Sequence, residues 1–143
     1  MTSTAHVPVF DTTLQKTHLW LHELMEAGGY ADEKVACGVL RVILHAIRDH
    51  LCVDEVADLA AEMPMLIRGL YYEQWKPSAP SHERTVPGFL GQIQAKLAPY
   101  RGVDAEEAIF AVFQLLNDHI TPGELSDVRG ALPHHIRDLW VTA

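Results

Sequence analysis

Two segments of the chain align with each other without a gap when the sequence is shifted by 69 residues. Residues 36–71 then face residues 105–140, and nine of the 36 aligned pairs are identical. The identical pairs are Ala36/Ala105, Asp49/Asp118, His50/His119, Glu55/Glu124, Asp58/Asp127, Pro64/Pro133, Ile67/Ile136, Arg68/Arg137 and Leu70/Leu139. Self-similarity at a fixed shift is typical of a structural unit used twice. We therefore predict two repeats, residues 10–75 and 88–140.

The apolar residues of both segments recur at helical spacing, and no segment shows a convincing alternation of apolar and polar residues. We predict an all-α fold of about eight helices, in which two four-helix repeats share one core. Sharing is expected because each half alone is too small to bury its apolar faces. The predicted helices span 11–28, 32–52, 54–63, 64–72, 89–97, 104–119, 121–132 and 133–140.

Short polar residues mark several predicted helix starts. Asp11, Asp32 and Asp54 are predicted N-caps, because an aspartate at this position accepts a hydrogen bond from a free amide of the first turn. Thr121 and Glu124 form a capping box, in which the hydroxyl and the carboxylate each satisfy one such amide.

Two predictions concern the faces of the first helices. In the first helix we expect one stripe to face the core: Leu14, His18, Leu21, Leu24 and Met25. In the second helix we expect Lys34, Arg41 and Arg48 to mark the solvent side.

A proline-rich connector, residues 76–87, separates the repeats and is predicted to be the most flexible internal segment. With 143 residues, the whole chain has the size of one globular domain. Cys37 and Cys52 lie about four turns apart on one predicted helix, too far for a disulfide, so we expect both to be reduced.

The formal charge of −8 opposes binding to nucleic acid, which requires clustered cations. The basic residues are scattered singly, so an anionic membrane surface is likewise an unfavourable partner. We find neither a secretory signal nor a membrane-spanning segment in the sequence, and we therefore expect an acidic, cytoplasmic protein.

The stretches from Val39 to Pro77 and from Ile120 to Trp140 resemble a prokaryotic family, the domain of unknown function 2267. The resemblance extends from Phe10 to Trp140 and rests on three motifs: the paired Leu/Met-Pro steps, Arg-Gly-Leu-Tyr-Tyr followed by Trp-Lys-Pro, and Thr-Pro-Gly-Glu. It implies an all-helical duplicated domain, and no enzymatic activity or ligand is established for the family.

Histidines offer two candidate sites. His18, His22 and Glu26 follow each other at four-residue spacing and could present metal ligands on one helical face. The interpretation we favour is structural, with a partly buried His18 beside a solvent-exposed His22. His134 and His135 are adjacent and point about 100° apart on a helix, which suits chelation poorly.

Arg68 and Arg137 occupy equivalent positions in the repeats. The structural interpretation is that each arginine ties its helix back to the preceding one by charge-assisted hydrogen bonds. The alternative is a small-molecule or anion site between the repeats, formed by these arginines together with His50 or His119.

Aromatic residues provide the remaining candidate surface. Tyr71, Tyr72 and Trp75 precede the connector, and Trp20 is expected on the outer face of the first helix. Tyrosine and tryptophan dominate protein interfaces, so our leading hypothesis is a non-enzymatic interaction or regulatory module that binds a protein partner or self-associates. We predict no cofactor and no catalytic residue, and the competing hypothesis is a small-molecule, anion or metal-ion binder, or an enzyme, with its site between the repeats.

Overall fold

The structure, a computed structural model, describes residues 7–142. This part of the chain forms eight α-helices and no β-strand, so the predicted all-α class is confirmed. The helices are α1 (Pro8–Gly28), α2 (Glu33–Arg48), α3 (Val53–Ala60), α4 (Met65–Tyr72), α5 (Val86–Lys96), α6 (Ala105–His119), α7 (Pro122–Ala131) and α8 (His134–Thr142). None of the described helices combines the length and hydropathy needed to cross a bilayer.

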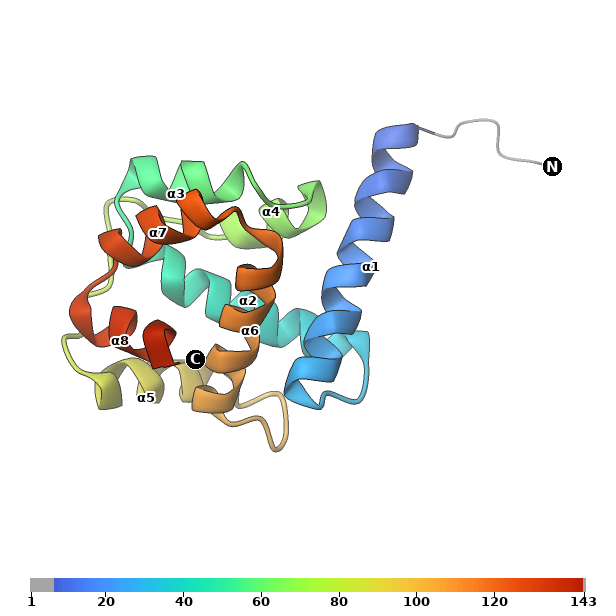
Figure 1. Cartoon of the computed structure of the whole chain (residues 1–143). Coiled ribbons are helices and arrows are strands. Elements are labelled where there is room, and N and C mark those ends of the chain that lie inside the picture. The colour runs from blue at the N-terminus through green and yellow to red at the C-terminus, as the bar shows by residue number, and fades with distance from the viewer. Residues whose placement is uncertain (1–6, 143) are drawn as a thin grey trace.

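Figure 1 shows α2 and α6 at the centre of the molecule, with α3 and α7 side by side above them and α5 and α8 below. Helix α1 stands at one edge, and its N-terminal end extends beyond the body. One apolar cluster contains side chains from both halves of the chain. Its centre is built from Leu40, Ile43, Leu44 and Ile47 of α2 and Ile109, Val112, Phe113 and Leu116 of α6.

The structure confirms some predicted caps and corrects others. The Asp32 carboxylate accepts a hydrogen bond from the Val35 amide, as predicted. Asp11 and Asp54 are not N-caps: α1 begins at Pro8, because proline is favoured in the first turn, and α3 begins at Val53. Both aspartates lie in the first turn of their helices, where the helix dipole favours negative charge.

The predicted capping box of α7 forms only in part. The Thr121 hydroxyl accepts from the Glu124 amide, but the Thr121 amide donates to the Glu62 carboxylate of the first half, at 2.8 Å. Because the Thr121 amide donates to Glu62, it does not donate to the Glu124 carboxylate, and the second hydrogen bond of the capping box is absent. The start of α7 is thus held by a residue from the other half.

The buried face of α1 differs from the predicted stripe. Leu21 and Leu24 are buried as expected, together with Thr13 and Trp20, whereas Leu14 and His18 are exposed. The N-terminal half of α1 lies at the edge of the body, where the Thr13 hydroxyl accepts a hydrogen bond from the Leu66 amide of α4. This contact rotates Leu14 outward.

Arg68 and Arg137 make corresponding contacts in the two halves. The Nε of Arg68 donates to the Ala60 carbonyl and its Nη2 to the Met63 carbonyl. Arg137 donates in the same way to the Arg129 and Leu132 carbonyls, 69 residues later, and also to the Gly130 carbonyl. Each arginine therefore satisfies carbonyls at the end of the preceding helix, as predicted, while the superposition of the two complete repeats stays a prediction.

Arg48 contradicts its predicted place on the solvent side of α2. Its side chain is only 4% exposed. The Nη1 atom donates to the carbonyls of Tyr71 and Glu73 at 2.7 and 2.8 Å, and Nε donates to the Asp49 carboxylate. The two carbonyls lie at the end of α4, so Arg48 fixes α4 against α2.

Candidate functional site

A buried group of three ionisable side chains joins both halves of the chain to the connector. Glu83 of the connector lies between His50, just after α2, and His135 in the first turn of α8. The His50 Nε2 atom lies 2.7 Å from both carboxylate oxygens of Glu83, and the His135 Nε2 atom lies 2.8 Å from Oε1. One ligand atom from each residue lies within 4.8 Å of the other two.

Local contacts orient each member of this His–Glu–His cluster. The Nδ1 atom of His50 is 2.6 Å from the Ala46 carbonyl, which is one of the free acceptors at the end of α2. The Ser81 hydroxyl donates to the Glu83 carboxylate, and the Ser81 amide donates to the Asp49 carbonyl. The connector therefore crosses the end of α2 in a defined path.

The cluster is almost closed to solvent. The side chains of His50, Glu83 and His135 are 4%, 7% and 12% exposed. The Phe89 ring meets both imidazoles edge-on, with centroid distances of 5.3 Å to His50 and 6.1 Å to His135. A charged carboxylate in such apolar surroundings is stable only when it is well paired.

The surroundings of Glu83 favour its charged form. Burial raises the pKa of Glu83, but hydrogen bonds from Ser81, His135 and His50 together outweigh burial, and the net pKa lies below its usual value. The carboxylate is thus ionised at neutral pH and available as an oxygen ligand.

The orientation of the His50 ring is compatible with metal binding. A carbonyl oxygen can only accept, so the Nδ1 atom facing Ala46 carries a hydrogen. The Nε2 atom can then either donate a second hydrogen to Glu83 or, without that hydrogen, bind a metal ion. Metal-binding histidines commonly donate their other ring nitrogen to a backbone carbonyl in this manner.

The predicted metal group of α1 is arranged differently. His18 and His22 both face Glu33 of α2, at 2.7 and 2.9 Å, rather than Glu26. The two histidine side chains are more than half exposed. His18 is therefore not the partly buried residue that the sequence indicated, and the pair with Glu33 fastens α1 to α2 at the surface.

The four residues of the predicted arginine and histidine site do not form one group, although Arg68 and His119 line the same surface hollow. Arg68 and Arg137 bind carbonyls within their own halves. His50 belongs to the His–Glu–His cluster, whereas His119 pairs with Glu23 of α1 at 2.8 Å and stacks on Trp20. His50 alone of the four lies at the junction of the connector and the two halves.

Two of the predicted aromatic contact residues are buried. Trp20 is 3% exposed, and Tyr71 is fully buried with its hydroxyl donating to the Val56 carbonyl. Neither can serve as a surface anchor, because both fill the core. Tyr72 and Trp75 are half-buried and pack against the core and each other, with a centroid distance of 5.6 Å.

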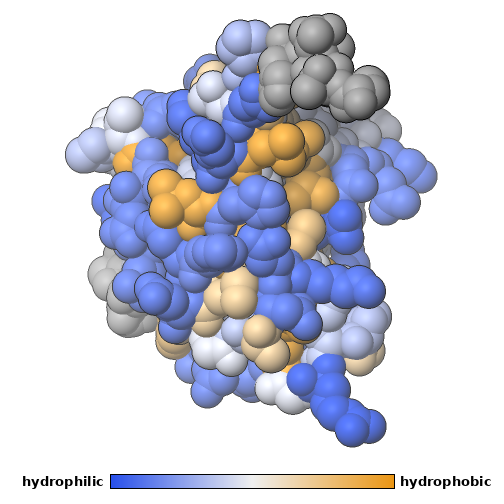
Figure 2. Space-filling view, turned by 90° about the vertical axis from the view of Figure 1, so that its right-hand side faces the viewer, coloured by the Kyte–Doolittle hydropathy of each residue, from blue (hydrophilic) through white to orange (hydrophobic). Residues whose placement is uncertain are grey.

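The exposed apolar side chains gather instead on α1 and at the start of α4. Figure 2, which faces α1, shows apolar groups in the upper part of the molecule, interrupted by polar side chains. The residues are Val7, Val9, Phe10, Leu14 and Leu19 with Met65 and Leu66. We refer to these seven residues as the α1–α4 apolar surface.

Glu55 and Glu124, which occupy equivalent positions in the two halves, meet between α3 and α7. The Oε1 atom of Glu55 and the Oε2 atom of Glu124 are buried and have no donor elsewhere in the described part of the chain. Burial and a hydrogen bond with Glu55 raise the pKa of Glu124 to about 8. With this raised pKa, the Glu124 carboxyl keeps a proton at neutral pH and can offer it to the neighbouring Glu55 side chain.

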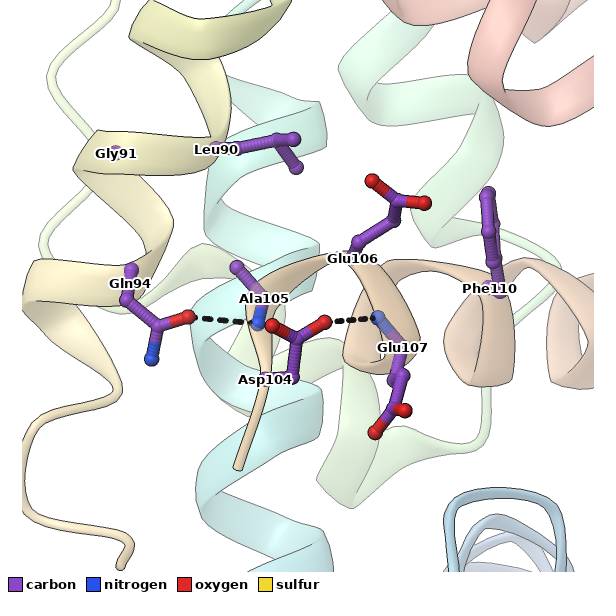
Figure 3. Close-up of a pocket in the computed structure, with 8 residues that line it drawn as sticks. All are labelled: Leu90, Gly91, Gln94, Asp104, Ala105, Glu106, Glu107 and Phe110. Atoms are coloured by element: carbon purple, nitrogen blue, oxygen red, sulfur yellow. Dashed lines mark hydrogen bonds between the residues drawn. The ribbon is translucent and has the colours of Figure 1, made fainter. Parts of the chain in front are cut away.

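The hollow between α5 and the start of α6, shown in Figure 3, has a volume of about 470 Å³. Its polar groups already have structural partners: the Gln94 side chain binds the Ala105 amide, and Asp104 caps α6 through the Glu107 amide. With Glu106 beside them, these groups make an acidic surface rather than a binding site.

Sequence reasoning missed Glu83 and dismissed His135. His50 and His135 are 85 positions apart, and Glu83 lies in the segment predicted to be flexible. Zinc motifs are usually recognised by short ligand spacings. No such spacing exists here, so only the fold reveals the cluster.

Comparison with models of protein families gives a match over most of the chain. A family model with the description "Uncharacterized conserved protein (DUF2267)" matches residues 17–139, and this confirms the resemblance inferred from the motifs. A search of curated proteins gave no match.

Proposed function

The chain belongs to the DUF2267 family, and we propose that it binds one divalent transition-metal ion of the zinc class at His50, Glu83 and His135. The observation that carries the proposal is the convergence of two imidazole nitrogens and one carboxylate oxygen within 4.8 Å, in a nearly closed site. Imidazole and carboxylate are typical zinc ligands.

The distances between the ligand atoms of the cluster are close to those found around a bound metal ion. Ligand atoms about 2.0–2.1 Å from a tetrahedral zinc ion lie about 3.3 Å apart. The distances from the Glu83 carboxylate to the two histidine nitrogens are 2.7 and 2.8 Å, so the side chains need to separate by about half an ångström. The Ser81 hydroxyl or a water molecule would complete four ligands.

The burial of the cluster supports a structural role for this ion. A catalytic zinc ion keeps an open position for substrate, whereas structural sites are closed. Exposures of 4–12% leave little access for a substrate. The ion would fasten the connector to the end of α2 and the start of α8.

Zinc titration of tag-free protein against a fluorescent chelator tests the proposal. The expected result is one tightly bound ion per chain. The His135→Gln variant should weaken binding about 100-fold or more, because removal of even a ligand's hydrogen-bond partner typically costs 10–100-fold.

The neighbouring histidine provides the matched control. His134 is exposed and lies outside the cluster, so His134→Gln should bind zinc as the wild type does. Absence of stoichiometric zinc binding to the wild type, or equal weakening by both variants, would exclude this site. Circular dichroism of each variant confirms that the helices are retained.

We also propose that the chain contacts a protein partner or a second copy of itself. The proposed contact surface is the α1–α4 apolar surface rather than the predicted aromatic residues. Phe10 is 56% exposed there, which favours the proposal because large exposed apolar side chains mark interaction sites. Sedimentation of the wild type and of Phe10→Glu tests self-association: a dimer should dissociate in the variant, and a monomeric wild type would exclude a second copy as the partner. A cytoplasmic location remains part of the proposal.

A further inference from the structure

A second surface hollow, of about 460 Å³, lies between α1, the α3–α4 turn and the end of α6. Its apolar part is formed by Leu19, Trp20, Met63 and Pro64, and its charged part includes Lys16 and Arg68. We propose that this hollow, the α1–α3 pocket, binds a small organic anion with an apolar body, such as an aryl-alkyl carboxylate. The inference is independent of the metal site.

The charge of the pocket distinguishes it from the other large hollows. Lys16 and Arg68 outnumber its one acidic residue, Glu62, whose two carboxylate oxygens are occupied by the amide and hydroxyl of Thr121. The hollow of Figure 3 is lined by three carboxylates instead. In a protein of net charge −8, the lining of the α1–α3 pocket thus carries more cationic than anionic side chains, which favours an anionic ligand.

Arg68 has hydrogen-bonding capacity left for a ligand. Its Nε and Nη2 atoms bind the carbonyls of Ala60 and Met63, and its Nη1 atom makes no hydrogen bond within residues 7–142. The backbone contacts hold the guanidinium in place, so an incoming carboxylate meets a donor that is already oriented.

The remaining wall suits an apolar or aromatic group. Trp20 lies at the base of the pocket, held by stacking on His119 at a centroid distance of 4.7 Å. Leu19, on the rim, is 54% exposed. A volume of about 460 Å³ falls within the range of pockets that hold small molecules, which combine apolar walls with a few polar anchors.

The test is an NMR titration of the full chain with 4-phenylbutyrate and with its uncharged amide. We expect the acid to cause saturable shifts at the Leu19, Met63 and Arg68 amides and at the Trp20 indole. The amide should bind about tenfold more weakly or not at all, because it lacks the charge that Arg68 and Lys16 recognise.

Two charge-reversal variants distinguish the effect of charge at the pocket from the effect of a change in the net charge of the protein. Lys16→Glu should weaken binding of the acid about tenfold or more, since it places a negative charge at the pocket. Lys34→Glu makes the same change at an exposed position of α2 and should leave binding unchanged. Equal binding of acid and amide, equal effects of the two variants, or no saturable shift with the acid would overturn the proposal. Both lysines are exposed, so neither variant should unfold the chain.

Discussion

At the scale of single residues, two arginines of α2 show how strongly the tertiary environment determines the role of a side chain. Arg41 forms an exposed ion pair with the Glu73 carboxylate, as its predicted solvent position allows. Arg48 is buried and binds the carbonyls of Tyr71 and Glu73. The sequence pattern places both arginines on one polar face of α2. It cannot distinguish them, because their partners lie at the end of α4, far away in the sequence.

This contrast predicts unequal stability losses. Arg48→Met should lower the free energy of unfolding by about 2–4 kcal/mol, since it leaves two carbonyls without their donor and Asp49 without its counter-ion. Arg41→Met should cost less than about 1 kcal/mol, as is usual for exposed ion pairs. Urea unfolding of both variants measures the difference, and equal losses would contradict the structural role of Arg48.

At the scale of secondary-structure elements, the sequence predicts the number and order of the helices, because apolar periodicity is a property of each segment. Helix starts are predicted less well. Asp32 and Asp54 both precede an apolar stripe, yet only Asp32 adopts the extended conformation and hydrogen bond of an N-cap. The orientation of α1 was also mispredicted, because Thr13 and Trp20 face the body while Leu14 does not.

Replacement of Asp32 and of Asp54 by alanine should destabilise the protein to different extents. Asp32→Ala should destabilise the protein by about 1 kcal/mol, the usual cost of removing an N-cap acceptor. Asp54→Ala should cost no more than about 0.5 kcal/mol, because it removes only a favourable charge in the first turn of α3. Thermal or urea unfolding measures both values, and a larger loss for Asp54→Ala would indicate that α3 begins two residues later, with Asp54 as its N-cap.

At the scale of the whole molecule, the carboxyl groups of Glu55 and Glu124 bring the two halves together between α3 and α7. The raised pKa of Glu124 means that the folded protein holds a proton which the unfolded chain releases. The stability contributed by this group is present below about pH 4.5 and is lost as the pH rises towards about 8. Asp58, Glu62 and Glu55 add negative charge on the same side.

Glu124→Gln should therefore remove most of this fall in stability. At pH 8 the variant should melt about 2–4 °C higher than the wild type, if relief of one like-charge contact is worth about 1 kcal/mol. At pH 5 the two melting temperatures should be similar. The control is Asp127→Asn on the same helix, at an exposed position. A wild type whose melting temperature does not fall between pH 5 and 8 would argue against the raised pKa of Glu124.

The candidate metal site also belongs to this scale, which explains why the sequence revealed so little of it. Only His50 was among the predicted ligand-binding residues, through its equivalence with His119. Glu83 carries no helical pattern, and His135 was judged against its neighbour His134 rather than against a residue 85 positions away. Their proximity depends on the packing of α2, α5 and α8, and no single segment encodes it.

The three members of the His–Glu–His cluster come from the first half, the connector and the last helix. During synthesis, His50 and Glu83 emerge from the ribosome well before His135. A nascent chain therefore lacks one of the three ligands until α8 has been translated and docked. Any zinc ion held there is acquired after α8 has been made, and its retention would report that α8 has docked against α2 and the connector.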